Sequence, residues 1–234
     1  MSRLPVDRRQ LMAGAGAASV LCSIRAKAAP LPHPKSVEVR SPNGRIVVSL
    51  LPPHAAEAFP CWAARLDERP ILELSRLALV LEDGKLLGPG ARFVGHRLSK
   101  HVEKWRPAYG IAKVYDGTRN ELEARFEDEQ SDLSFAIRFA AHNDGIAVRY
   151  VLLGPGTRTI RLGGEATSLR FPRGSRAWSS RDEGEYAVSA PESIAPIPHP
   201  DLTGSTDKGP LADPPLTVVT AEGLTLCVCE SDRL

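Results

Sequence analysis

The sequence predicts an all-β protein folded as a large antiparallel β-sandwich. Apolar residues recur with a period of two over most of the chain from Ser36 onward, which is the spacing of strands with one buried face. Pairs of Asn or Asp followed by Gly separate these runs, and such pairs suit tight hairpins. Helical spacing is nearly absent. Many short strands joined by such turns are typical of a sandwich.

The strands are predicted one after another along the chain. They are VEVR at 37–40, RIVVSLL at 45–51, CWAARL at 61–66, ARFVGHRL at 91–98, NELEARFE at 120–127, DLSFAIRFAAH at 132–142 and IAVRYVLL at 146–153. Turns are predicted at 42–44, 83–84, 116–117 and 143–145, where Asn or Asp before Gly fits the positive φ of tight turns. The last of these turns joins the final two strands into a hairpin.

Two stretches are less regular. The leucine spacing of 70–84 fits a helix or a strand entered through a turn at Ser75, and the turn at 83–84 favours a strand for its second half. Residues 181–215 contain seven prolines, which argue against a helix or a central strand. We therefore expect a long loop there, of the kind that is often functional.

The first 28 residues read as an export signal that precedes a domain at 29–234. Arg8 and Arg9 stand before a mildly apolar run at 11–21, and Ala26-Lys27-Ala28 offers a small-residue cleavage site. The paired arginines resemble a twin-arginine signal. The apolar run is too short to span a membrane, which takes about 20 residues. A periplasmic or secreted protein is predicted.

The charge and cysteine content exclude some classes of function. The formal charge is +2, and removal of 1–28 takes away five basic residues and one acidic residue, which leaves −2. No basic stripe with interleaved aromatic residues points to nucleic acid. Three cysteines then remain, Cys61, Cys227 and Cys229, too few for a disulfide framework. Cys227 and Cys229 share one side of a strand-like run, and we expect that side to be buried and not to bind a metal.

Aromatic residues beside carboxylates mark candidate sugar sites, because pyranose faces stack on aromatic rings and carboxylates accept hydrogen bonds from hydroxyl groups. Trp105, Tyr109 and Tyr115 form one such group, and Trp178 with Tyr186 forms another. Core packing is the alternative for each ring. From these two groups, Trp105, Tyr109, Trp178 and Tyr186 are the predicted substrate-binding residues.

The densest carboxylate group is Asp182, Glu183 and Glu185. It reads as a solvated acidic loop or as part of a Ca²⁺ site. Because Ca²⁺ takes six to eight oxygen ligands, these residues alone could not complete such a site, and the other ligands would come from another domain.

Several motifs, taken in order, resemble the N-terminal domain of glycoside hydrolase family 97, a family of α-glucosidases and α-galactosidases. The matching stretches include SPNGRIVVSL at 41–50, SRLALVLEDGKLLG at 75–88, RFAAHNDGIAVRY at 138–150, GGEATSLRFP at 163–172 and PLTVV at 215–219. NDGIAVRY is the most specific of them. The resemblance spans about 36–234.

The resemblance implies a galactose-mutarotase-like sandwich packed against a catalytic (β/α)8 barrel, with a Ca²⁺ ion held in part by a sandwich glutamate. Glu183 is the best match for this glutamate, and Glu185 is the alternative. The family's catalytic carboxylates belong to the barrel, which the sequence does not reach before Leu234, so we assign no catalytic residue. Such a chain is expected to bind an α-linked glycan and to be inactive alone.

Two other interpretations stay open. The chain could be a truncated product or one half of a split enzyme, completed by a barrel chain in trans. It could also be a stand-alone periplasmic interaction domain that binds no sugar.

Overall fold

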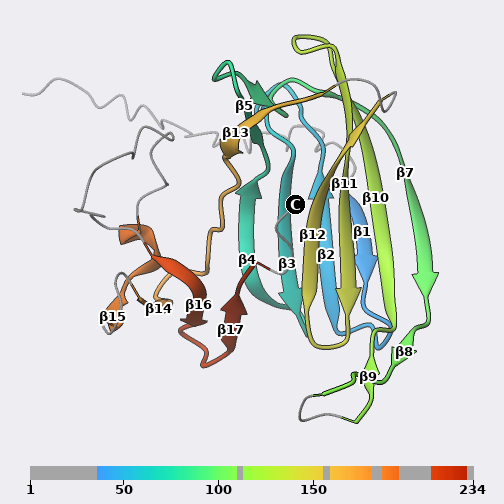
Figure 1. The fold of residues 1–234 in the computed structure, drawn as a ribbon. Coiled ribbons are helices and arrows are strands. Elements are labelled where there is room, and N and C mark those ends of the chain that lie inside the picture. The colour runs from blue at the N-terminus through green and yellow to red at the C-terminus, as the bar shows by residue number, and fades with distance from the viewer. Residues whose placement is uncertain (1–35, 110–112, 155–158, 181–185, 195–211, 231–234) are drawn as a thin grey trace, which may run out of the picture. The chain divides into compact units, whose positions relative to one another are not determined.

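The computed structural model describes residues 36–109, 113–154, 159–180, 186–194 and 212–230, all within one compact unit that spans 34–234 (Figure 1). These residues form seventeen strands and one short 3-10 turn, η1 (Pro191–Ser193). The fold is an antiparallel, all-β, sandwich-like domain, and the predicted fold class is confirmed. The export signal predicted at 1–28 lies outside the described residues.

Strands from the first part of the chain form one sheet in the order β1-β2-β3-β4. They are β1 (Val37–Arg40), β2 (Ile46–Leu51), β3 (Cys61–Leu66) and β4 (Arg69–Arg76). The period of two predicted from the sequence appears directly in the burial, because Val48 and Leu50 are fully buried in the core while Ser49 between them is only partly covered.

The second sheet has the order β12-β11-β10-β7. Its strands are β7 (Arg92–His101), β10 (Arg119–Asp128), β11 (Leu133–His142) and β12 (Ile146–Leu153). A β-bulge interrupts the pairing of β10 with β7 beside Phe126. Every strand here was predicted from alternation to within three residues at each end.

The two sheets pack face to face around a shared core. The ring centroids of Trp62 in β3 and Phe139 in β11 lie 5.6 Å apart. Phe126 stacks on Phe135 with centroids at 5.2 Å, and both are buried. Strand β1 contacts β10 and β11, and β2 contacts β11. Burial of these aromatic side chains, together with the Val, Leu, Ile and Ala side chains of both sheets, stabilises the fold.

The turn at 143–145 closes the β11–β12 hairpin and also ties the two sheets together. The backbone N–H of His142 donates to the Gly145 carbonyl at 2.9 Å. The Asn143 side-chain oxygen accepts from the Asn43 N–H at 2.9 Å, which links it to the β1–β2 turn. Gly44 has a φ of +76°, as predicted, whereas Gly145 does not adopt a positive φ of this kind.

The remaining strands form three smaller sheets. One has the order β13-β5-β6, one pairs β8 with β9, and one has the order β15-β14-β16-β17. Their bounds are β5 (Leu79–Leu81), β6 (Leu86–Leu87), β8 (Lys104–Trp105), β9 (Tyr115–Asp116), β13 (Leu162–Glu165), β14 (Arg176–Ser180), β15 (Tyr186–Ser189), β16 (Asp213–Val219) and β17 (Thr225–Val228).

Four predictions need correction. The stretch 70–84 is extended in its first half as well, since β4 occupies it. Residues 116–117 do not close a hairpin between β9 and β10, because β9 pairs with β8 instead. Pro214 and Pro215 belong to β16, a central strand, although prolines argued against one. They stand near its start, where the ladder with β14 is irregular, and a strand tolerates proline there.

The expected burial of Cys227 and Cys229 is also wrong, since both thiols are exposed. Leu226 and Val228 take the partly buried side of β17 and pack against the core, so alternation turns the cysteines outward. Cys61 is buried, and burial raises the pKa of its thiol to about 11. It packs as an apolar side chain.

Candidate functional site

An aromatic pair on the β8–β9 hairpin is the candidate site. The hairpin lies beyond the ends of β7 and β10 (Figure 1). Trp105 and Tyr115 stand opposite each other in the ladder, and cross-strand partners share a face. Their rings stack with centroids at 5.5 Å and an interplanar angle of 17°. Trp105 is 48% exposed and Tyr115 is 41% exposed, so the pair presents a broad apolar surface to solvent.

A glycine holds the tryptophan ring close to the backbone. A Cβ atom on Gly117 would lie 2.6 Å from the Trp105 ring, which is well inside van der Waals contact. The N–H of Gly117 donates to the Glu103 carbonyl at 2.9 Å, so the residue is fixed just where the chain leaves the hairpin. The sequence predicted a turn at Gly117 and offered no signal for this contact.

Charged residues occur in and beside the hairpin that carries the aromatic pair. Arg119 donates to Glu121 at 2.6 Å and to Glu103 at 2.9 Å. The Asp116 carboxylate accepts a hydrogen bond from the backbone N–H of Thr118 at 2.9 Å. Hydrogen bonding with Thr118 lowers the pKa of the Asp116 carboxyl. Ionised carboxylates and a guanidinium beside an exposed apolar face suit a polyhydroxylated ligand, which needs both stacking and hydrogen bonds.

The other predicted binding residues do not join this pair. Tyr109 lies on the same hairpin, is 90% exposed and makes no ring contact among the described residues. Trp178 is half-buried on β14, with the Arg176 guanidinium 5.5 Å above its ring. Tyr186 is in β15 opposite Ser180, and the structure describes only its backbone. The two aromatic groups thus belong to separate sheets.

The predicted metal ligands Glu183 and Glu185 lie outside the described residues, as does Asp182. Within the part of the chain that the structure describes, no three His, Cys, Asp or Glu side chains gather closely enough to hold a metal ion. The same residues include no helix long and apolar enough to cross a membrane.

A depression of about 370 Å³ lies over β2, β3 and β4. Its walls are mostly apolar, and its charged lining residues are Arg65, Glu68 and Glu73. The Arg65 guanidinium pairs with Glu38 at 3.3 Å and with Glu68 at 3.5 Å, which gives it a structural role.

The described carboxylates are poor candidates for a catalytic proton donor. A general acid needs a raised pKa so that it keeps its proton near neutral pH. Glu123 is buried, yet hydrogen bonds from Arg125 at 2.8 Å and Arg138 at 2.7 Å lower the pKa of its carboxyl. The described carboxyl groups with a clearly shifted pKa all shift downward; they are Glu38, Asp67, Asp83, Asp116 and Glu123.

The lowered pKa of Glu123 predicts a pH dependence of stability. Because the folded-state pKa lies below the unfolded value, the ion pairs stabilise the fold above the unfolded pKa, and this contribution is lost as the pH falls through the folded pKa. Glu123→Gln is expected to flatten the acid side of the stability curve, by about 1 kcal/mol, in urea unfolding between about pH 3 and 7. Glu82→Gln, in an exposed pair with Arg161, is the control. An equal effect of both variants would contradict the prediction.

Comparison with known proteins identifies the family. The model of the glycosyl-hydrolase 97 N-terminal family matches residues 39–234. A retaining alpha-galactosidase from Bacteroides thetaiotaomicron is 28% identical over 169 residues, which cover 70% of this chain and 24% of that protein.

Solved structures share the fold. A glycoside hydrolase family 97 enzyme from Pseudoalteromonas sp. strain K8, in complex with panose, has a TM-score of 0.65 at 17% identity, over 81% of this chain and 27% of that one. A beta-arabinopyranosidase has a TM-score of 0.56 at 21% identity, over 62% of this chain and 23% of that one. The chain spans about a quarter of the length of these relatives. With its model match over nearly all the described residues, the chain belongs to the glycosyl-hydrolase 97 N-terminal domain family.

Proposed function

We propose that this domain binds α-linked carbohydrate through the Trp105–Tyr115 pair, as the N-terminal module of a family 97 glycosidase. The observation that supports this best is the exposed, nearly parallel ring stack on the β8–β9 hairpin. An aromatic pair in a hydrophobic core would be covered, whereas these rings lie on a small hairpin outside the main sheets. Their faces offer the flat apolar surface on which a pyranose ring stacks.

The substrate class follows from the relatives. One is named a retaining alpha-galactosidase, and a structure of another holds panose. We infer that the ligand is an α-glucoside or α-galactoside. The hydrolytic carboxylates belong, in this proposal, to a (β/α)8 barrel joined in cis or in trans, because the described carboxyl groups with shifted pKa values are all poised as anions.

Two further parts of the proposal concern segments outside the described residues. Glu183, or Glu185 in its place, contributes one ligand to a Ca²⁺ ion whose other ligands come from the barrel. Residues 1–28 direct export, so the domain works in the periplasm or outside the cell.

Titration of the purified chain with panose and with melibiose, in the presence of Ca²⁺, tests the proposal by calorimetry. Trp105→Ala is expected to weaken binding about tenfold or more, because it removes a stacking face that contributes roughly 1–2 kcal/mol. Gly117→Ala is expected to weaken binding by a smaller factor, since its methyl group displaces the ring without removing it. Trp178→Ala is the matched tryptophan control.

Loss of binding in Trp178→Ala but not in Trp105→Ala would move the site to β14. Absence of saturable binding to either sugar would favour a periplasmic interaction domain. Hydrolysis of an aryl α-glycoside by the pure chain would refute the assignment of catalysis to the barrel.

A further inference from the structure

Strand β7 extends beyond the sheet that should cover it. Because β1 contacts β10 and β11, the outermost strand of the first sheet lies over β10 and not over β7. The Asn120 side chain of β10 donates to the Arg40 carbonyl of β1 at 2.7 Å, which fixes this alignment. Strand β7 pairs only with β10 among the described strands, so it overhangs the sandwich by one strand (Figure 1).

The inward side of β7 is consequently uncovered. Leu98 stands opposite Leu122, and His96 stands opposite Ala124. Both partners are fully buried in the core, and residues opposite each other share a face. Yet Leu98 is 55% exposed, and Val102, on the same alternation just past the strand, is 73% exposed. These side chains point to the core side of the sheet, but no segment among the described residues lies over them.

At the opposite margin of the first sheet, the edge strand is β4, and its outer edge is already paired. The Glu73 N–H donates to the Arg170 carbonyl at 2.8 Å, and the Arg76 N–H donates to the Ser168 hydroxyl at 2.8 Å, so residues 168–170 run along β4. Among the described strands, β1 pairs only with β2, so its other edge has no such neighbour in the described part of the chain.

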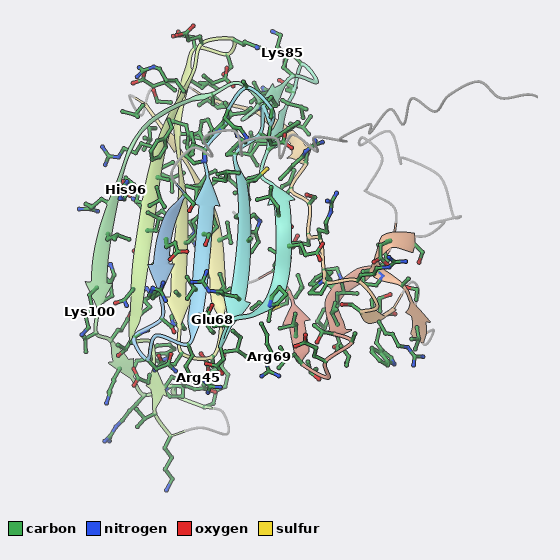
Figure 2. All side chains as sticks on the ribbon, turned by 180° about the vertical axis from the view of Figure 1, so that it is seen from behind. Arg45, Glu68, Arg69, Lys85, His96 and Lys100 are labelled. Carbon is green, nitrogen blue, oxygen red and sulfur yellow. The ribbon has the colours of Figure 1, made fainter. Side chains whose placement is uncertain are left out.

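The uncovered side carries a lysine and a histidine but no carboxylate. Strand β7 reads RFVGHRLSKH and contains no acidic residue. Arg92 pairs with Glu127, and His101 pairs with Glu121, but His96 and Lys100, which share the alternation of Leu98, have no ion-pair partner in the described structure. Figure 2 labels both residues on the strand at the margin of the sheet. A second copy of this chain would bring two Lys100 side chains together, whereas an acidic segment would neutralise the Lys100 ammonium group.

We propose that the margin formed by β1 and β7 accepts an added β-strand. The occupant is an extended segment of the same enzyme's remaining polypeptide, with apolar residues in alternation and at least one acidic residue. Its backbone pairs with the edge of β1 that faces away from β2, where it replaces the Asn120 side chain at the Arg40 carbonyl. Its apolar side chains cover Leu98, and its carboxylate meets Lys100. The relatives hold about three quarters of their length outside the matched region, which provides such segments. The proposal rests on family membership and not on sugar binding.

The test uses the purified chain and two synthetic peptides of about ten residues. Both alternate valine with polar residues, and one contains glutamate where the other contains lysine. Binding is measured by fluorescence anisotropy, and amide exchange is followed by mass spectrometry. We expect the acidic peptide to bind and to slow exchange in Val37–Arg40, and the basic peptide to bind at least tenfold more weakly.

Leu98→Lys is expected to weaken binding of the acidic peptide about tenfold or more, because it removes the apolar contact and adds a charge to bury. Leu74→Lys is the matched control, since Leu74 is 45% exposed on β4 in the other sheet, and it should change affinity less than about twofold. Sugar binding should be the same in both variants. Equal binding of the two peptides, no binding of either, or slowed exchange away from β1 and β7 would overturn the proposal. A dimer in sedimentation that Leu98→Lys dissociates would overturn it too, since the occupant would then be a second copy.

Discussion

Replacement of Phe126 by alanine is expected to lower the free energy of unfolding by about 4 kcal/mol. Phe126 is fully buried, and its ring lies 5.2 Å from Phe135 and 5.5 Å from Phe93 between centroids. The bulge in the β10–β7 ladder occurs at this residue, so backbone collapse into the vacated space would disturb the pairing of both strands. The cost of the lost apolar burial and the cost of the cavity therefore both reduce the free energy of unfolding.

Urea unfolding followed by circular dichroism measures this effect. Leu74→Ala is the control, because its side chain is partly exposed and its removal should cost less than about 1 kcal/mol. A loss below about 2 kcal/mol for Phe126→Ala would mean that the open β7 margin lets the core rearrange around the missing ring.

Alternation predicted the strands of the two main sheets, apart from β4, because the relevant physics is local. A strand with one buried face must repeat its apolar residues every second position. Strand β11 does so from Leu133 to Ala141, and β10 does so at Leu122, Ala124 and Phe126. The hairpin at Asn143 was visible for the same reason. The hydrogen bond from the Asn43 N–H to the Asn143 side chain was not, because it joins residues that are 100 positions apart.

The candidate site was predicted only as residue types. Trp105 and Tyr115 were grouped by composition, but their stacking depends on the β8–β9 register, which two-residue strands leave undetermined in the sequence. The contact between Gly117 and Trp105 depends on the same register. The exposed cysteines of β17 show the related limit: alternation says that two residues share a side, and the surrounding sheets decide which side is buried.

The buried carboxylate of Asp128 carries the second large prediction. Its side chain is almost fully buried at the end of β10. One oxygen accepts from the backbone N–H groups of Gln130 at 2.9 Å and Ser131 at 3.2 Å. The other faces the N–H of Gly88 at 3.4 Å, from a residue 40 positions away. This single side chain thus closes the β10–β11 turn and joins it to the chain after β6.

Asp128→Ala is expected to cost about 3 kcal/mol of unfolding free energy, because it leaves one buried and two partly buried backbone donors without their acceptor. Asp128→Asn keeps one acceptor oxygen for the turn and should cost about half as much, through the Gly88 contact and the lost charge. Asp83→Ala is the control, since Asp83 accepts from the Lys85 N–H at 3.1 Å in an exposed turn, where water replaces the lost acceptor, and its loss should cost less than about 1 kcal/mol. Urea unfolding of the three variants ranks these costs. If Asp128→Ala and Asp83→Ala lost the same amount, burial would add nothing to the local turn, and the long-range contact to Gly88 would have no energetic weight.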